Sequence, residues 1–312
     1  MGQSKYTIDR EVGRGAFGAV YLAHVKSSGR MVAIKTMRRS KRTGIDWTAL
    51  REVRLLLELK HPNVVELVDV FALADSMNMV MEFCPFDLGH VIERKTVLLT
   101  EEQIKAYIKM SFTGLLAIHE RWVLHRDIKP DNLLVGMDRQ VKVADLGLAA
   151  TFGEPDTEDS YKVVTLPYRA PELLFGAREY GVGVDTWAMG CVMAEMMIRR
   201  IFLPGANEED QLAKIFYYFG TPTEKEWPKM ASLHKFVLFE NKPPRPLKEV
   251  FGAAYSADAL DLVAALLRVN PANRLSAKDA LQHRWFSQGP IARPEDLPFD
   301  VFANRGKKDA AA

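Results

Sequence analysis

The chain has 312 residues, of which 48% are hydrophobic, so it can form one large domain or two lobes that share a cleft. A formal net charge of +2 at pH 7 gives no general basis for direct nucleic-acid binding or for attraction to a membrane surface. The two cysteines, Cys84 and Cys191, are too few for a disulfide framework or a zinc site and indicate a reducing compartment.

We expect neither a signal peptide nor a transmembrane segment. The N-terminus lacks a basic flank followed by an apolar stretch. The longest apolar run, residues 184–198, contains Asp185 and Glu195 and is short for a bilayer, so it predicts a buried core helix.

The first 83 residues predict a small sheet interrupted by one helix. Short segments rich in β-branched or apolar residues, separated by glycine and serine turns, predict strands over residues 7–12, 19–24, 31–36, 65–71 and 77–83. Between the third and fourth of these, apolar residues at helical spacing predict a helix from about Asp46 to Lys60, before Pro62.

From Cys84 onward the pattern becomes helical. A capping box at Thr100–Gln103 opens one helix, and apolar periodicity predicts others over residues 185–199, 208–219, 257–267 and 277–283. Residues 221–251 are rich in proline and show little periodicity, which predicts a long loop or an ordered insert. We expect the polar tail from about Gly289 to be flexible.

Two polar motifs, in this order, indicate phosphoryl transfer. Residues 125–132 read His-Arg-Asp-Ile-Lys-Pro-Asp-Asn, and residues 145–147 read Asp-Leu-Gly. Transfer of a phosphoryl group needs positioning and charge neutralisation rather than a covalent nucleophile. A polar turn beside a buried strand would explain either motif alone, but it does not explain both together with the residues described below.

Each polar residue of the two motifs has a chemical use in such a transfer. Asp127 can accept the proton of a substrate hydroxyl, and Lys129 can lie against the γ-phosphate. Asn132 and Asp145 can hold Mg²⁺ through oxygen atoms.

Residues 13–20, Gly-Arg-Gly-Ala-Phe-Gly-Ala-Val, match a glycine-rich loop whose backbone N–H groups approach phosphate oxygens. Alone, this match also fits an ordinary turn. A dinucleotide fold would need a strand followed by a helix, whereas here strand follows strand, which favours a lid over ATP.

A lysine and a glutamate complete the pattern. Lys35 lies on the next predicted strand, where its ammonium can bind the α- and β-phosphates, and Glu52 in the predicted helix is its natural ion-pair partner. Either residue alone could equally be a solvated surface charge.

With these motifs and Ala170-Pro171-Glu172, the chain resembles a eukaryotic protein kinase over roughly residues 6–287. The resemblance implies an α+β, bilobal protein kinase fold, with a β-rich N-lobe that carries one regulatory helix and a mainly helical C-lobe. We expect an N-lobe over residues 1–84, a C-lobe over residues 85–287 and a C-terminal tail over residues 288–312. It also implies that Glu172 pairs with Arg274 and that Asp185 braces the catalytic loop.

The resemblance further implies ATP and Mg²⁺ as cofactors and assigns site residues. The implied catalytic residues are Asp127, Lys129, Lys35, Glu52 and Thr165. The implied nucleotide-binding residues are Val12, Gly13, Gly15, Gly18, Val20, Ala33, Lys35, Met81, Glu82, Phe83, Cys84, Asp87, Lys129, Asn132, Leu134 and Asp145, and the metal ligands are Asn132 and Asp145. Met81 would be the gatekeeper, and Cys84 would act as a small hydrophobic residue.

Within the protein kinases the chain is similar to the cyclin-dependent kinases, above all to those of the CDK-activating kinase and transcription factor IIH. This resemblance implies Ser/Thr-Pro substrates, with the substrate proline recognised by Val164 and Arg169, because proline lacks an N–H that would be left unpaired there. It implies an H-type cyclin and a RING-finger assembly factor as partners, other cyclin-dependent kinases and the RNA polymerase II heptad tail as substrates, and a nuclear location. A cell-cycle or other proline-directed kinase, or a non-catalytic pseudokinase scaffold, remains an alternative.

Ser160 aligns with the residue phosphorylated in the activation segment of this family, and Arg51 and Arg126 would contact the phosphate. Four positions depart from the family pattern: Leu146 replaces Phe, Ala150 replaces a basic residue, Glu154 replaces a phosphorylatable Ser, and Pro167 replaces Trp. These departures concern the on/off balance, the phosphate site and peptide preference.

Overall fold

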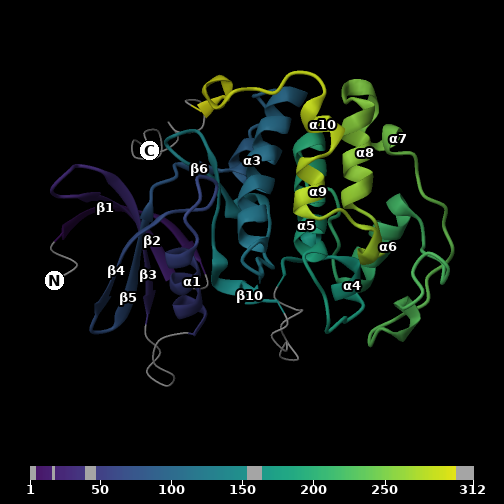
Figure 1. Cartoon of the computed structure of the whole chain (residues 1–312), viewed down its shortest axis with the longest axis horizontal. Coiled ribbons are helices and arrows are strands. Elements are labelled where there is room, and N and C mark those ends of the chain that lie inside the picture. The colour runs from purple at the N-terminus through teal and green to yellow at the C-terminus, as the bar shows by residue number, and fades with distance from the viewer. Residues whose placement is uncertain (1–4, 16–17, 39–46, 153–163, 300–312) are drawn as a thin grey trace.

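The computed structural model describes residues 5–15, 18–38, 47–152 and 164–299, which form two lobes (Figure 1). The smaller lobe is a sheet with one helix, and the larger lobe is mainly helical, as the resemblance implies. Among these residues no helix is both long enough and apolar enough to cross a lipid bilayer.

Five strands among the described residues form one antiparallel sheet in the order β1-β2-β3-β5-β4. They are β1 (Tyr6–Gly15), β2 (Gly18–Val25), β3 (Met31–Arg38), β4 (Leu67–Leu73) and β5 (Ser76–Glu82). All five were predicted from the sequence, with ends that differ by up to about three residues, because alternation of apolar residues marks a strand's middle better than its ends.

Gly18 shows why the hairpin between β1 and β2 needs glycine. Its φ is +143°, and a Cβ at this position would lie 2.0 Å from the carbonyl oxygen of Thr36 on β3. A Cβ on Gly13, by contrast, would meet no described atom within 4 Å. Sheet packing therefore requires the glycine at position 18, whereas Gly13 borders open space.

The helix of the small lobe, α1 (Trp47–Glu58), presents one buried face to the sheet. Ala49, Glu52 and Leu56, spaced three and four residues apart, are all at most 4% exposed. Glu52 thus lies on the packed face, and its carboxylate points into the protein.

The large lobe is built around two long helices, α3 (Glu101–His119) and α5 (Gly183–Ile198), whose buried side chains include Phe112, Leu115 and Trp187. The predicted capping box is present: the Thr100 hydroxyl accepts the Gln103 N–H at 3.3 Å, and the Gln103 side chain accepts the Thr100 N–H at 3.2 Å. The remaining helices are α2 (Leu88–Glu93), α4 (Pro171–Leu174), α6 (Glu208–Phe219), α7 (Leu247–Phe251), α8 (Ala257–Leu266), α9 (Ala277–Leu281) and α10 (Arg284–Ser287).

Short strands between β5 and α4 flank the polar motifs. They are β6 (Phe86–Asp87), β7 (Val123–Leu124), β8 (Leu133–Val135), β9 (Val141–Val143) and β10 (Ala150–Thr151). At Gly114 of α3, a Cβ would lie 2.1 Å from the carbonyl oxygen of Asn63, which itself accepts the Val143 N–H at 2.9 Å. This close approach fixes β9, and with it the start of the Asp145 motif, against the core helix.

Two expectations about irregular segments had different outcomes. Residues 221–251 form a largely irregular segment with a 3₁₀ turn over Met230–Ser232 and α7 at its end. Of the two alternatives predicted for this segment, a long loop or an ordered insert, the structure shows the ordered insert. The expectation of a flexible tail from Gly289 is wrong for its described part. Leu297 and Phe299 are 3% and 7% exposed, because each packs its apolar side chain against the large lobe.

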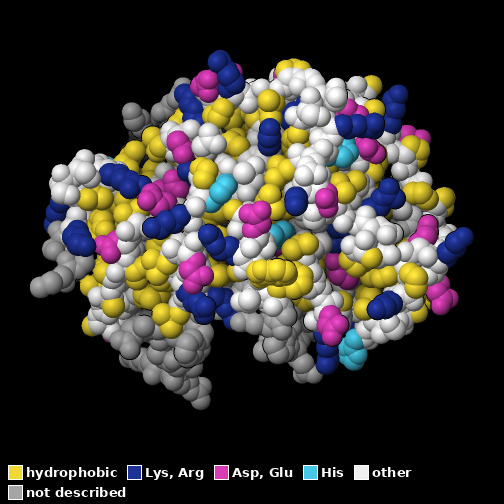
Figure 2. All heavy atoms as spheres, in the orientation of Figure 1, with side chains coloured by type: hydrophobic (Ala, Val, Ile, Leu, Met, Phe, Trp, Pro, Cys, Tyr) yellow, Lys and Arg dark blue, Asp and Glu magenta, His cyan; other side chains and the backbone are white. Residues whose placement is uncertain are grey.

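Surface charge is mixed on the face that Figure 2 shows. Lysine and arginine side chains alternate with aspartate and glutamate over both lobes. This pattern fits the small net charge, and on this face it gives no extended field of one sign.

Candidate active site

Lys35 of β3 joins the two lobes. Its Nζ lies 3.1 and 2.9 Å from the two carboxylate oxygens of Glu52 and 2.9 Å from Oδ1 of Asp145. Asp145 belongs to the large lobe and follows Lys35 by 110 residues. The ion pair expected from the sequence is therefore present, and a second carboxylate from the other lobe joins it.

Burial and charge oppose each other in this cluster. Burial lowers the pKa of Lys35, but the attraction of Glu52 and Asp145 outweighs it, and the pKa is raised. Burial raises the pKa of Asp145, but the Lys35 ammonium outweighs it, and the pKa is lowered. Glu52 lies deepest, and burial together with repulsion from Asp145 raises its pKa. Asp145 is thus the carboxylate held ionised and suited to bind a cation.

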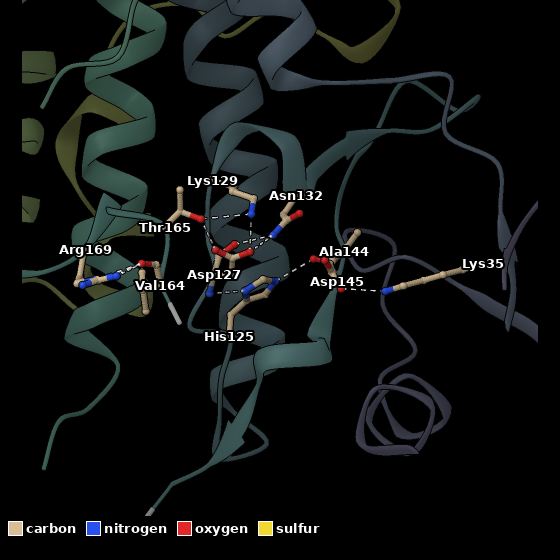
Figure 3. A network of polar contacts seen from close by, with 10 residues as sticks. All are labelled: Lys35, His125, Asp127, Lys129, Asn132, Ala144, Asp145, Val164, Thr165 and Arg169. Carbon is tan, nitrogen blue, oxygen red and sulfur yellow. Dashed lines mark hydrogen bonds and ion pairs between the residues drawn. The ribbon is translucent and has the colours of Figure 1, made fainter. Parts of the chain in front are cut away.

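The Asp127 carboxylate is held by donors from two segments (Figure 3). Lys129 Nζ and Asn132 Nδ2 donate to its Oδ2 at 2.6 and 2.9 Å, and the Thr165 hydroxyl donates to its Oδ1 at 2.8 Å. Lys129 also donates to the Thr165 oxygen at 3.3 Å. Asp127 is 4% exposed, so its orientation is set by these contacts rather than by water.

Asp185 at the start of α5 fixes the backbone just before Asp127. Its carboxylate accepts the N–H groups of His125 and Arg126, both at 2.8 Å, and contacts Nε2 of His119 at 2.9 Å. Arg126 has a φ of +67°, a region that non-glycine residues seldom adopt. The buried Asp185 thereby holds a backbone turn that would otherwise relax, which is the bracing role expected for it.

His125 connects the two polar motifs. Its Nδ1 accepts the Asp127 N–H at 3.2 Å, so its Nε2 carries the proton that is shared with the Ala144 carbonyl at 2.9 Å. Asp145 follows Ala144 directly and has a φ of +64°. One buried imidazole therefore sets the relative positions of Asp127 and Asp145 (Figure 3).

Arg169 is bound to the backbone of Val164, as Figure 3 shows. Its Nε and Nη2 donate to the Val164 carbonyl at 3.1 and 2.7 Å, and its Nη1 donates to Glu208 on α6 at 2.7 Å. Arg169 is 7% exposed. The Val164 carbonyl is thus already satisfied by two donors.

The oxygen atoms of Asn132 and Asp145 fit a magnesium ion that is shared with a phosphate. The Asn132 amide nitrogen donates to Asp127, so its carbonyl oxygen is the atom that remains for a cation. Within the described residues no group of three or more His, Cys, Asp or Glu side chains could form an all-protein metal site. Two hard oxygen ligands, with the rest supplied by phosphate and water, are typical of Mg²⁺ and not of zinc.

Strand register brings together the residues expected around the nucleotide. Gly13 is paired with Val20, Gly15 with Gly18, and Ala33 with Met81. Val12 precedes this hairpin turn and is 40% exposed. The others lie where the lobes join: Glu82 ends β5, Phe83 and Cys84 follow, Asp87 ends β6, and Leu134 is in β8.

The surroundings of Asp87 and Cys84 show further roles for these two residues. The Asp87 carboxylate caps α2 by accepting the His90 N–H at 2.9 Å. Burial raises the pKa of the Cys84 thiol, which fits a packing residue better than a reactive one.

The residues expected to regulate the site lie around the segment after Asp145. Arg51 donates to the Ala149 carbonyl at 3.1 Å, and Arg126 donates to the Leu148 carbonyl at 2.6 Å. Both arginines therefore border the path of this segment. Ser160 and Glu154 lie outside the described residues.

The other three residues that depart from the family pattern, Leu146, Ala150 and Pro167, lie within the part of the chain that the structure describes. Leu146 is fully buried, so it keeps the apolar packing that a Phe would give, and Ala150 is 8% exposed. The carbonyl of Pro167 accepts an N–H from Gln211 at 3.3 Å.

Several supporting residues were not predicted. Tyr168 donates to the buried Glu195 at 2.7 Å, Arg126 donates to the Tyr180 hydroxyl at 3.1 Å, and Glu208 binds Arg169. In the sequence, Glu195 stands out only as a charge inside an apolar run. That charge was the available signal, because a carboxylate on the buried face of a helix requires a partner.

Comparison with known proteins agrees with this geometry. The family model "Protein kinase domain" matches residues 6–286. The chain belongs to the protein kinase family. The predicted bilobal fold is confirmed by this match and by the structural likeness described next.

The most informative similarities are to cyclin-dependent kinases. This kinase is 46% identical over 300 residues to "Cyclin-dependent kinase 7" of Dictyostelium discoideum, covering 94% of this chain and 83% of that protein. It is 42% identical over 290 residues to "Serine/threonine-protein kinase KIN28" of Saccharomyces cerevisiae, covering 92% and 94%. It superposes on a chain in the "CAK complex" of Chaetomium thermophilum bound to ATP-gamma-S, with a TM-score of 0.88, 37% identity and 95% coverage of both chains. This kinase is a serine/threonine kinase of the cyclin-dependent type.

Proposed function

We propose that this kinase is the catalytic subunit of a CDK-activating kinase. It transfers the ATP γ-phosphoryl group to Ser or Thr of other cyclin-dependent kinases and of the RNA polymerase II heptad tail. The observation that carries the proposal is the cluster of Lys35, Glu52 and Asp145 across the two lobes, next to the fixed Asp127 carboxylate. The similarity to cyclin-dependent kinase 7 proteins and to the CAK complex supports the subtype.

The reaction uses the residues in distinct roles. Asp127 orients the substrate hydroxyl and accepts its proton, and Thr165 and Lys129 keep the carboxylate in place. Lys129 lies close enough to stabilise the charge on the transferred group. Lys35, held by Glu52, positions the α- and β-phosphates of ATP. Asn132 and Asp145 would hold Mg²⁺, which would neutralise phosphate charge when bound.

The nucleotide lies between the lobes in this proposal. The glycine hairpin of β1 and β2 covers the phosphates, with Gly13 next to open space. The backbone of Glu82 and Cys84 bonds the adenine between Ala33 and Leu134, Met81 closes the back of the pocket, and Asp87 meets the ribose. The N-lobe then ends at residue 84, and the C-lobe extends to residue 287.

Substrate preference for proline has a backbone cause. Arg169 occupies the Val164 carbonyl with two hydrogen bonds, so this carbonyl is not free for the N–H of the residue that follows the phosphorylated Ser or Thr. Desolvating an unpaired N–H costs about 1–3 kcal/mol, and proline has no N–H to lose.

The partners in this proposal are an H-type cyclin on α1 and a RING-finger assembly factor near the activation segment. In this proposal Arg51 and Arg126 gather a phosphate on Ser160. Their hydrogen bonds to the Ala149 and Leu148 carbonyls, in the segment after Asp145, support this role. The family relationship also supports a nuclear location.

Replacement of Asp145 tests the catalytic part of the proposal. Asp145→Asn keeps the shape of the side chain but removes the charge that binds both Lys35 and the metal, so ATP turnover should fall by at least about 100-fold. Asp261→Asn, on the exposed surface of α8, is the matched control and should retain activity. Unchanged turnover in Asp145→Asn would contradict the role given to Asp145, whereas a native protein without ATP turnover would favour the pseudokinase alternative.

A substrate panel tests the subtype separately. Purified enzyme with its cyclin is offered heptad-tail peptides, activation segments of other cyclin-dependent kinases and typical cell-cycle substrates. We expect the first two classes to have the highest kcat/KM. A preference for cell-cycle substrates would keep the kinase activity and overturn the proposed subtype.

A further inference from the structure

A cavity of about 490 Å³ lies in the large lobe, between the ends of α6 and α8 and the irregular segment before α7. Figure 1 shows these elements on the side of the large lobe that faces away from the small lobe. The phosphoryl-transfer residues Lys35, Asp127 and Asp145 do not line this cavity. Its volume is typical of a ligand pocket, and the proposed reaction does not use it.

The charged side chains that line the cavity are mostly cationic. They are Lys242, Arg245 and Arg268, together with one carboxylate, that of Glu226. Oε2 of Glu226 accepts the N–H and the hydroxyl of Thr223 at 2.8 and 2.9 Å, so this carboxylate is bound by neutral donors. The lining therefore carries an excess of positive charge.

The cationic groups keep donors for a ligand. Neither Arg245 nor Arg268 makes a side-chain hydrogen bond or an ion pair within the described part of the chain. The Arg245 guanidinium lies over the Tyr217 ring, 3.9 Å from its centroid, which steadies the group and leaves its in-plane N–H groups for an acceptor. Lys242 pairs with Glu240 at 3.6 Å, but the two side chains are 50% and 81% exposed, and such a pair is weak.

The backbone that carries Lys242 and Arg245 is fixed to the end of α6. The Arg245 N–H donates to a carbonyl of α6 at 3.0 Å, and the Thr221 N–H donates to the Lys242 carbonyl at 2.9 Å. Gly220 has a φ of +82°, and a Cβ there would lie 2.9 Å from the nitrogen of Pro244. Because this wall is already ordered, little entropy is lost when a ligand binds to it.

The opposite wall, which carries Arg268, is held from inside the lobe. The Arg268 carbonyl accepts Nε of the buried Arg274 at 3.0 Å. Asn270 Nδ2 donates to the Glu226 carbonyl at 2.7 Å, which ties this wall to the turn after α6. Two fixed segments thus present Arg245 and Arg268 to one cavity.

Two arginines on fixed walls match a phosphate group, because guanidinium N–H groups bind phosphate oxygens in a two-point geometry. Leu247 and Leu267 also line the cavity and can cover an apolar side chain next to a phosphorylated residue. A nucleic-acid backbone would favour a long basic surface, whereas here the cations line one cavity. We propose that this cavity binds a phosphorylated Ser or Thr in a segment of another protein, with its phosphate on Arg245 and Arg268. This docking site is separate from the active site and goes beyond the proposed function.

Binding of a labelled phosphopeptide to the full-length protein tests the site. The probe is a short peptide with one phosphoserine next to a leucine, its control is the same peptide with serine, and fluorescence anisotropy gives the Kd of each. We expect the phosphate to lower the Kd by at least about 10-fold, and either Arg245→Gln or Arg268→Gln to remove most of this gain. Both arginines are exposed, so neither change should disturb the core.

The matched control is Arg54→Gln, which replaces an 81% exposed arginine of the small lobe and should keep the phosphate-dependent gain. Equal Kd values for the two peptides would overturn the proposal. So would an unchanged Kd in both cavity variants, because the peptide would then be held elsewhere, for example by the arginines near the activation segment.

Competition distinguishes the possible sources of the phosphate. Inorganic phosphate lacks the peptide contacts, so it should displace the probe only at concentrations at least about 10-fold above those of unlabelled phosphopeptide. Equal competition by inorganic phosphate would show a site for phosphate alone. A single-stranded oligonucleotide that binds more tightly than the phosphopeptide, and loses affinity in the same variants, would show a nucleic-acid site. Either result would overturn docking of a phosphorylated protein.

Hydrogen exchange locates the bound peptide in the native protein. The phosphopeptide should slow exchange over residues 218–223 and 267–273 at least about five-fold and leave residues 123–132 unchanged. Protection confined to residues 123–132, beside the active site, would contradict the proposed location.

Discussion

Glu172 and Arg274, separated by 102 residues, meet in a two-point ion pair inside the large lobe. Arg274 Nη1 donates to Glu172 Oε1 at 2.7 Å, and Nη2 donates to Oε2 at 3.0 Å. The Arg274 side chain is fully buried. The pair ties the start of α4, just after the substrate segment, to the turn before α9, and it was expected from the family resemblance.

Loss of this pair should destabilise the kinase. Arg274→Met leaves the Glu172 carboxylate buried without its partner, and we expect the free energy of unfolding to fall by about 3–5 kcal/mol. Urea denaturation at pH 7 measures the change. Arg284→Met, which removes an arginine that is 59% exposed, is the control and should change stability by less than about 1 kcal/mol. Similar losses in both variants would contradict a special role for the buried pair.

Replacement of Lys35 should remove activity. In Lys35→Met the carboxylates of Glu52 and Asp145 face each other without a cation, and the phosphates lose their ammonium contact. We expect kcat/KM for peptide phosphorylation to fall by at least about 100-fold. Lys5→Met, which breaks only an exposed pair with Asp69, should leave kcat/KM unchanged. A Lys35 variant with normal kcat/KM would exclude the proposed phosphate contact.

Glu195 should make stability depend on pH. Burial raises its pKa from the ordinary value of 4.5 to about 7. The folded protein therefore binds this proton more tightly than the unfolded chain does. The resulting stabilisation is present below about pH 4.5 and is lost as pH rises through about 7.

Glu195→Gln tests this sign. Gln keeps an acceptor for the Tyr168 hydroxyl but carries no charge, so the variant should gain stability over the native protein on going from pH 5 to pH 8. The gain is on the order of 3 kcal/mol. Unfolding free energies at the two pH values measure it, with the exposed Glu58→Gln as control. A variant effect that is equal at both pH values would show that Glu195 does not titrate between them.

Thr165 should support catalysis through its hydroxyl. Thr165→Val removes the donor to Asp127 and the acceptor for Lys129 while keeping the shape of the side chain. We expect kcat to fall roughly 10-fold, because the Asp127 carboxylate loses part of its orientation. Thr165→Ser keeps the hydroxyl and should restore most of kcat. If Ser and Val variants have the same kcat, the hydroxyl does not act through Asp127.

Arg169 should set the preference for proline. In Arg169→Ala the Val164 carbonyl is free to accept an N–H, so peptides with alanine after the phosphorylated Ser should gain relative to peptides with proline. We expect the ratio of kcat/KM values to shrink about 10-fold. Glu208→Gln removes another Arg169 contact but leaves the Val164 carbonyl occupied, and it should keep the preference. A library in which native enzyme shows no penalty for replacing proline would refute this account.

The sequence alone predicted the order and type of the main elements and the identity of the polar motifs. The five strands, α1 and the capped α3 all follow from interactions between residues close in sequence, namely side-chain alternation, helical spacing and a local cap. The motif residues could be assigned roles for the same reason, since their spacing is local. The resemblance then supplied the long-range pairs.

Only the tertiary structure decided which distant groups touch and in what geometry. Three contacts depend on how β3, the segment before α4 and α5 pack together. They are the contact of Lys35 with its second partner Asp145, the hydrogen bond from Thr165 to Asp127, and the hydrogen bond from Tyr168 to Glu195. The packed tail up to Phe299 was missed for the same reason. Its few apolar side chains give no periodic signal, and the burial of Phe299 depends on the surface that β6 and the β8–β9 turn present to it.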